Sequence, residues 1–188
     1  MHLSLITDEL APSLSRALDV CEELGIDAVE LRTLDGVQVV DHTEEELAAI
    51  RAELDRRRFT VSALASPFLK CGRGEEHDDV LDRAIRAASV LGTSLVRAFG
   101  WWREPDPAAT LPDLGRALHA AGVRASAAGL TLVLENEHEC NVANAAEARA
   151  ALDAAGAPAL RLIWDPGNAA MLDPGAWHGL GGLENEVA

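Results

Sequence analysis

The sequence predicts an α/β fold, a (β/α) barrel of which six of the usual eight units are present. Apolar runs of strand length begin near residues 3, 28, 60, 94, 131 and 160, and helical apolar spacing fills the intervals between them. Such alternation is typical of a parallel sheet with helical crossovers. The first turn, residues 7–12, contains no glycine, whereas an open dinucleotide-binding sheet usually carries G-x-G-x-x-G there. This difference favours the barrel.

The first two helices are bounded by ordinary start and stop residues. Pro12 stands near the start of the first helix and Gly25 just past its end, with apolar residues at helical spacing between them. Thr43 and Glu46 form a capping box that opens a second helix, which runs through Leu54. Two further intervals are predicted to be loops, namely residues 7–12 and 104–110.

The later helices carry similar signals. A third helix stops at Gly92, and a fourth covers about residues 111–128 before Gly129. Asn144 and Glu147 form a second capping box, which opens a short fifth helix. The sixth strand then begins near residue 160.

The length of the chain falls short of a complete barrel. A (β/α) barrel needs eight units and about 250 residues, and this sequence has 188. Successive strands begin roughly 25 to 37 residues apart, so a seventh strand is expected near or just past Ala188. We therefore expect a single barrel domain over residues 1–188, truncated before strand 7. Its unpaired edges predict poor solubility or self-association.

Composition excludes several classes of protein. The formal net charge of −15 repels nucleic acid, which binds clustered Lys and Arg. No apolar segment approaches the roughly 20 residues needed to cross a bilayer, and the N-terminus lacks the pattern of a secretory signal. The three cysteines are scattered and odd in number, which indicates free thiols in the cytoplasm: Cys21, Cys71 and Cys140.

Two strands end in acidic and amide groups. The run TLVLENEHE, residues 131–139, places Glu135 at a strand end, and LRLIWDPGN, residues 160–168, does the same for Asp165. Neighbouring parallel strands lie roughly 5 Å apart, and two carboxylates that close repel unless a cation or a proton lies between them. The pair therefore predicts a divalent metal site for Mg²⁺ or Mn²⁺, with Co²⁺ and Zn²⁺ as alternatives. The competing interpretation is that these acids cap helices or pair with Arg.

Further polar and aromatic residues at the strand ends are candidates for substrate binding. Arg97 has an alternative role as an ion-pair partner of Glu30 or Glu135, and His138 as a solvent-exposed loop residue. Lys70 is either a phosphate contact or a surface lysine. Trp101 and Trp102 either line the pocket or cover the top of the barrel or a subunit interface. The predicted substrate-binding residues are Glu30, Arg97, Asn136, Glu137, His138, Asn168 and Trp101.

Six segments in order carry a family resemblance. ITDEL, GIDAVELR, SALASPFLK, LVRAFG, LVLENE and WDPGNA together resemble the sugar phosphate isomerase/epimerase family, which has the xylose isomerase-like TIM barrel. The resemblance implies that Glu135 and Asp165 bind a divalent metal. The family's His on strand 7 and Glu on strand 8 have no counterpart here, and Asn168 stands where many members have His.

The resemblance also implies an activity. The expected reaction is isomerisation or epimerisation of a sugar, sugar phosphate or polyol by proton transfer through an enediolate, with Glu135 as both ligand and base. The expected partner is a small sugar or polyol, with neither nucleic acid nor membrane, and self-association into a homo-oligomer is also considered.

Two alternatives stay open, and a third is disfavoured. Dehydration of an inosose-like polyol needs the same metal and base. A degenerate, non-catalytic barrel that binds a sugar agrees with Asn168 and the missing strands. Apurinic-site DNA cleavage is disfavoured, because ELR and ASP occupy the strand ends where those enzymes carry zinc-binding histidines.

Overall fold

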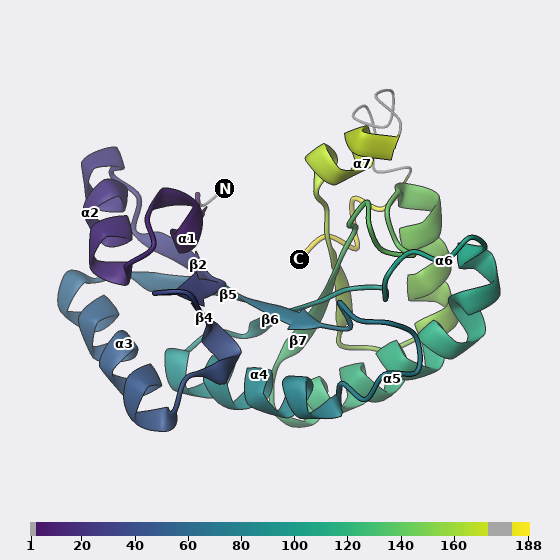
Figure 1. Ribbon diagram of the computed structural model, residues 1–188, viewed down its shortest axis with the longest axis horizontal. Coiled ribbons are helices and arrows are strands. Elements are labelled where there is room, and N and C mark those ends of the chain that lie inside the picture. Colours follow the sequence, from purple (N-terminus) through teal and green to yellow (C-terminus); the bar gives the residue numbers. More distant parts are fainter. Residues whose placement is uncertain (1–2, 173–181) are drawn as a thin grey trace. The chain divides into compact units, whose positions relative to one another are not determined.

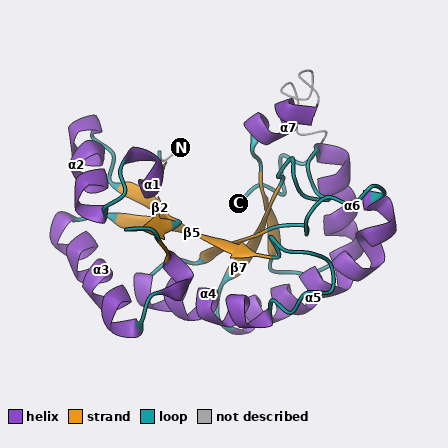
Figure 2. Cartoon of the chain, viewed as in Figure 1, coloured by secondary structure: helices purple, strands orange, loops and turns teal. Residues whose placement is uncertain are grey.

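The computed structural model describes residues 3–172 and 182–188 and shows strands alternating with helices (Figures 1 and 2). The strands are β1 (Leu5–Ile6), β2 (Ala28–Leu31), β3 (Thr33–Leu34), β4 (Val37–Gln38), β5 (Thr60–Phe68), β6 (Leu95–Ala98), β7 (Thr131–Glu135) and β8 (Leu160–Ile163). The α-helices are α1 (Thr7–Leu10), α2 (Leu14–Leu24), α3 (Glu44–Arg57), α4 (Asp78–Leu91), α5 (Leu111–Ala127), α6 (Ala145–Ala155) and α7 (Pro166–Leu172). The predicted α/β fold is confirmed.

Six of these strands form one sheet in the order β1-β2-β5-β6-β7-β8. The pairs β1–β2, β2–β5 and β7–β8 are parallel, with Glu135 opposite Ile163 in the last of them. After Asp165 and α7, the chain returns beside β8, where Val187 makes a parallel bridge to Leu162. Val187 lies close to Ala188, near which the sequence predicts the seventh strand of the barrel.

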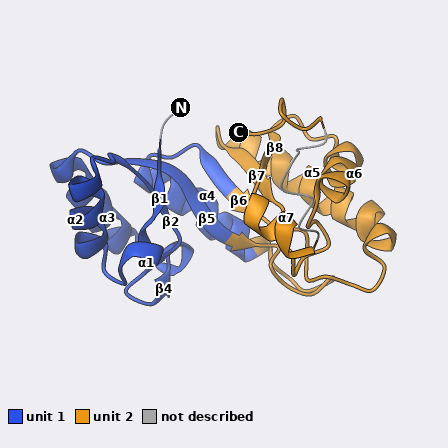
Figure 3. Cartoon of the chain, turned by 90° about the horizontal axis from the view of Figure 1, so that it is seen from above, with its two compact units in different colours: residues 1–66, 79–96 blue, residues 67–78, 97–188 orange. Residues whose placement is uncertain are grey.

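The chain divides into two compact units, coloured separately in Figure 3. Unit 1 comprises residues 1–66 and 79–96, and unit 2 comprises residues 67–78 and 97–188. Strands β5 and β6 contribute residues to both units. The expectation of one domain over residues 1–188 stays a prediction.

Unit 1 contains two elements that the sequence analysis missed. Residues 7–10 form the short helix α1 instead of a loop. Asp8 and Glu9 favour a helical first turn, and the Asp8 carboxylate accepts hydrogen bonds from Arg32 Nε (2.9 Å) and the Thr33 amide (3.3 Å). Strands β3 and β4 form an antiparallel hairpin, whose Asp35-Gly36 turn has positive φ at both residues.

The predicted helix caps are confirmed in one case and half-confirmed in the other. Thr43 and Glu46 form both hydrogen bonds of a capping box at the start of α3. At α6 the Asn144 side chain accepts from the Glu147 amide (3.0 Å). The Glu147 carboxylate, however, accepts from the Ala143 amide (2.9 Å) and pairs with Arg103.

In unit 2, helices α5 and α6 pack closely against each other (Figure 1). A Cβ atom at Gly115 would lie 2.8 Å from the Ala154 carbonyl oxygen, and one at Gly122 would lie 2.9 Å from Ala157 Cβ. Gly115 therefore allows the close approach of these helices, and Gly122 allows α5 to approach the segment that follows α6. On the inner side, Leu132, Val133 and Leu134 of β7 are fully buried, which agrees with a strand covered on both faces.

Two further corrections concern unit 2. Residues 107–110, predicted to be a loop, form a 3-10 turn whose start is capped by the Asp106 side chain. Helix α7 was not predicted, although Pro166 at its first position and Asp165 before it are ordinary helix-start residues. Among the described residues, no helix is long and apolar enough to cross a membrane.

Candidate functional site at the strand ends of unit 2

Glu135 forms a buried ion pair. It is the last residue of β7, and its Oε2 accepts a hydrogen bond of 2.9 Å from the Arg97 guanidinium of β6. The two side chains are only 12% and 8% exposed. The guanidinium also lies 4.8 Å from the centre of the Phe99 ring. One of the two partners proposed for Arg97 is thus present.

Asp165 is fixed by two asparagines. The buried Asn136 side chain donates to the Asp165 carbonyl oxygen and accepts from the Asp165 amide, both at 2.7 Å. The Asp165 carboxylate accepts from the amide and the side chain of Asn168, both at 2.9 Å. Asp165 therefore caps α7, as the competing interpretation of this acid held, while Asn136 determines where its backbone lies.

Glu137 is buried in unit 2, although the residues that follow it in the sequence are polar. Its carboxylate pairs with the Lys70 ammonium and accepts from the Glu139 amide. The ammonium lies 4.8 Å from the centre of the Phe99 ring and 5.6 Å from that of Trp102. Burial raises the pKa of Glu137, but the hydrogen bond from Lys70, the Glu139 amide and the nearby charges outweigh it, so the pKa lies below its ordinary value.

Lys70 is the residue whose role the sequence left most open. It follows β5, in the segment SPFLK, at the same end of a strand as the predicted site residues. Its position after a strand was the available signal, but nothing in the sequence identified Glu137 as its partner.

His138 lies between two acceptors. Its Nδ1 is 2.8 Å from Asn168 Oδ1 and 2.8 Å from Glu137 Oε1. Because the side chain is 35% exposed, it is neither a core residue nor a free loop residue. Three of the predicted site residues, Glu137, His138 and Asn168, are thus in contact.

The two tryptophans differ in exposure. Trp101 is buried and has a left-handed φ of +58°, an uncommon value for a bulky residue. Its amide donates to the Leu69 carbonyl (2.9 Å) and its carbonyl accepts from the Asn141 amide (3.0 Å), which hold this conformation. Trp102 is exposed and bridges to Cys140.

Burial and the Glu137 charge raise the pKa of Cys140 to about 12. All three cysteines are free and buried.

Glu30 belongs to unit 1. It lies in β2 opposite Ile6 of β1 and Ala63 of β5, beside an irregularity in the β2–β5 register. Such irregularities redirect side chains. A role for Glu30 in substrate binding stays a prediction.

Two sets of donors in unit 2 have the chemistry of a cation site. Glu135 and Asp165 are carboxylates at the ends of neighbouring strands, and each oxygen can accept more than one partner. Their present contacts are therefore compatible with a hard divalent ion. Within the described part of the chain, Glu137, His138 and Glu139 also offer three donor atoms within 4.8 Å of one another.

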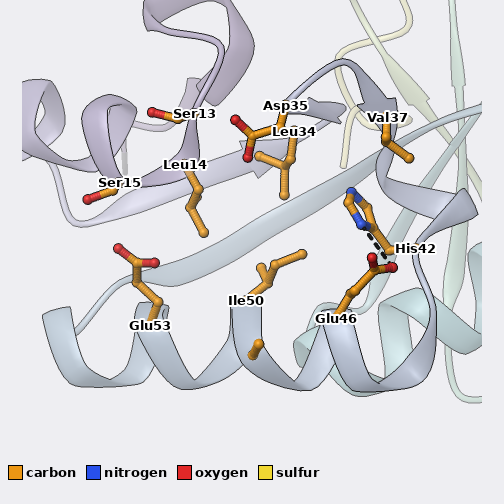
Figure 4. Close-up of a pocket in the computed structure, with 11 residues that line it drawn as sticks. Ser13, Leu14, Ser15, Leu34, Asp35, Val37, His42, Glu46, Ile50 and Glu53 are labelled. Atoms are coloured by element: carbon orange, nitrogen blue, oxygen red, sulfur yellow. Dashed lines mark ion pairs between the residues drawn. The ribbon is translucent and has the colours of Figure 1, made fainter.

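A hollow of about 500 Å³ lies in unit 1, between α2 and α3 (Figure 4). Leu14, Leu34 and Ile50 line its interior, and His42 pairs there with Glu46 at 3.4 Å (Figure 4). None of the predicted site residues lines it. The hollow is therefore a feature separate from the carboxylates of β7 and β8.

The fold and the strand-end residues define an α/β protein with acidic and amide groups at the carboxyl ends of parallel strands. Residues 18–183 match the model of the xylose isomerase-like TIM barrel family, and the chain belongs to that family. No curated protein matches the chain.

Solved structures agree with this fold. The probable 3-DHS dehydratase AsbF from Bacillus anthracis has a TM-score of 0.74 at 13% identity, over 89% of this chain and 64% of its own. The IOLI protein with a bound zinc atom has a TM-score of 0.72 at 19% identity, over 96% and 66%. D-psicose 3-epimerase, solved in the presence of D-fructose, has a TM-score of 0.72 at 16% identity, over 96% and 70%. The chain thus spans about two thirds of the length of these proteins, and identities this low show the fold alone.

Proposed function

We propose that this chain carries part of the site of a metal-dependent isomerase or epimerase of a sugar, sugar phosphate or polyol. The observation that carries the proposal is the placing of Glu135 and Asp165 at the ends of neighbouring strands, each held by its own polar partners. Family membership supports the class of reaction. The proposal also includes a small-molecule substrate and no nucleic acid, in keeping with the charge of −15.

Each residue has a proposed role. Glu135 and Asp165 hold the divalent ion, which when bound polarises the carbonyl and hydroxyl of the substrate. The Glu135 carboxylate takes a proton from the carbon next to the carbonyl and returns it to the neighbouring carbon or to the opposite face. Arg97 orients Glu135, because its guanidinium lies 2.9 Å from one carboxylate oxygen. Asn136 positions Asp165 through its backbone.

A cytoplasmic location and binding of Mg²⁺, Mn²⁺, Co²⁺ or Zn²⁺ belong to the same proposal. Three free thiols support the location, and the carboxylate donors suit hard ions. A dehydratase that uses the same metal and base would begin with the same proton abstraction and then lose water. Product analysis, in which dehydration gives an unsaturated ketone and isomerisation does not, separates the two.

Thermal unfolding with added metal tests the proposal. We expect Mn²⁺ or Mg²⁺ to raise the unfolding temperature of the chain, because binding at a hundredfold excess over Kd adds about 2.7 kcal/mol to the free energy of unfolding. Glu135→Gln should remove the effect. The matched control is Glu139→Gln, which changes an exposed carboxylate of the second donor set. If Glu139→Gln removes the effect and Glu135→Gln does not, the ion binds the second set and the proposal is wrong.

A second candidate is a non-catalytic barrel that binds a sugar. The observation that favours it is that both carboxylates already have structural partners, Arg97 for Glu135 and helix α7 for Asp165. It predicts that metals leave the unfolding temperature unchanged while a sugar raises it.

A further inference from the structure

The starting observation is the pair of contacts at one nitrogen of His138. Nδ1 makes a hydrogen bond of 2.8 Å with Asn168 Oδ1, and Glu137 Oε1 lies at 2.8 Å from the same nitrogen. Both neighbours are themselves fixed. Glu137 is held by Lys70 and the Glu139 amide, and Asn168 is held by Asp165.

The orientation of the Asn168 amide determines which atom faces His138. Asp165 Oδ2 belongs to a carboxylate, which only accepts hydrogen bonds when ionised. The Asn168 group 2.9 Å from it must therefore be the NH₂ group, and the oxygen must face the imidazole. Because Asn168 Oδ1 and Glu137 Oε1 are both acceptors, the proton of a neutral His138 ring must be on Nδ1.

The tautomer decides what the other ring nitrogen can do. With the proton on Nδ1, Nε2 carries a lone pair and is an acceptor. Nε2 has no hydrogen-bond partner among residues 3–172 and 182–188, and the side chain is partly exposed. We propose that His138 is a substrate-binding residue whose Nε2 accepts a hydrogen bond from a substrate hydroxyl, and that Asn168 is its positioning residue. The assignment of a hydroxylated substrate rests on the function proposed above.

The same chemistry selects among ligands. The ionised oxygens of a phosphate and a carbonyl oxygen are acceptors, so they cannot bind to an Nε2 that also accepts. Glu137 and Glu139 add negative charge beside the ring, and the Lys70 ammonium is already paired with Glu137. A neutral polyol therefore fits this position better than an anion.

The tautomer is directly measurable by ¹⁵N NMR of the histidine side chains, in metal-free buffer at alkaline pH. Two other histidines serve as internal references. His119 Nδ1 lies 2.8 Å from the Ala155 carbonyl oxygen, an acceptor, so its proton is on Nδ1. His77 Nδ1 accepts from the Leu69 amide at 2.9 Å, so its proton is on Nε2. We expect His138 to give the pattern of His119. The pattern of His77 at His138 would overturn the inference.

Addition of ligands tests the role of Nε2. D-Fructose and myo-inositol are expected to shift the Nε2 resonance of His138 in the direction of hydrogen-bond acceptance, and inorganic phosphate is expected to leave it unchanged. A shift with phosphate alone, or no shift at saturating concentrations of both polyols, would contradict the inference. Neither result depends on turnover or on metal, so failure here is distinguishable from failure of the metal test with Glu135→Gln.

Two variants separate a structural role from a binding role. The amide of His138→Asn reaches the position of Nδ1 and keeps the contact with Asn168, whereas the longer His138→Gln places its amide where Nε2 stands. We expect His138→Asn to weaken D-fructose binding by about 3- to 10-fold, the loss of one net hydrogen bond, and His138→Gln to weaken it less. Equal weakening by both variants, with unchanged unfolding temperatures, would show that Nε2 does not bind the ligand.

Discussion

Two histidine–glutamate pairs, one in each unit, differ in how firmly the carboxylate is held. In unit 1, His42 Nδ1 lies 3.4 Å from Glu46, whose side chain is 59% exposed. In unit 2, His138 Nδ1 lies 2.8 Å from Glu137, whose side chain is 8% exposed. Glu46 is already used by the capping box of α3, since its carboxylate accepts from both the amide and the hydroxyl of Thr43. A carboxylate orients an imidazole strongly only when burial and further partners fix the carboxylate first.

The causes of the two pKa values show the same difference. The pKa of Glu46 is lowered chiefly by the hydrogen bonds from Thr43, at an exposed helix start. For Glu137 burial acts in the opposite direction, and the hydrogen bond and charge of Lys70 are needed to lower the pKa. Lys70 is therefore the residue on which the unit 2 pair depends.

The largest expected effect comes from removing that cation. Lys70→Met leaves a buried carboxylate without its main partner, and we expect it to lower the free energy of unfolding by about 3 kcal/mol, at the low end for an uncompensated buried charge because His138 and the Glu139 amide remain. Chemical denaturation measures the loss.

Two controls define this result. Lys70→Arg keeps the charge and should lose less, and the double variant Lys70→Met/Glu137→Gln should recover part of the loss because neither charge remains. A loss below about 1 kcal/mol for Lys70→Met would place the pair with ordinary surface ion pairs.

An intermediate effect is expected from acid. The folded pKa of Glu137 is lowered, so the stability that its ionised form contributes is fully present above the ordinary value of 4.5 and is lost as the pH falls through the lower folded pKa. Stability measured between neutral and acidic pH should therefore fall less steeply in Glu137→Gln than in the wild type. Parallel curves for the two proteins would contradict this assignment.

The smallest effect is expected in unit 1. Glu46→Ala removes half of a capping box and a weak contact to His42, and should cost about 0.5 to 1 kcal/mol. His42→Gln should cost less than Glu46→Ala, because the carboxylate serves the helix start more than the imidazole. Thermal unfolding of both variants tests the order, and a larger loss in His42→Gln would reverse the comparison.

Much of the fold could be predicted because its signals are local. Apolar strand runs and glycine stops located all six strands of the large sheet and helices α2 to α6 close to their observed bounds. The elements that were missed are short. Helices α1 and α7 have too few residues for a periodic pattern, and the hairpin of β3 and β4 depends on positive φ at Asp35, which an apolar pattern does not reveal.

The sequence predicted at which strand ends the site residues lie, but not which residues they contact. Strand ends identified Glu135, Asp165 and their neighbours, because parallel strands deliver their last residues to one edge. The partners come from chain segments far apart in the sequence, as with Lys70 and Glu137, 67 residues apart. Asn136 and Glu137 are adjacent, yet one contacts the backbone of Asp165 and the other contacts Lys70. The sequence alone does not indicate that these two adjacent residues have different partners.

Asn136 has a consequence for how the site can vary. Its side-chain amide donates to the Asp165 carbonyl and accepts from the Asp165 amide, as a peptide group of a neighbouring strand would. The hydrogen bonding between β7 and β8 thus continues to Asp165 through a side chain, and the backbone of the following loop is not used. The backbone pairing of the two strands ends at Glu135 and Ile163, and the contact between Asn136 and Asp165 lies beyond it. The backbone of Asp165 is therefore held by Asn136 itself and not by the contacts that residues 137–144 make.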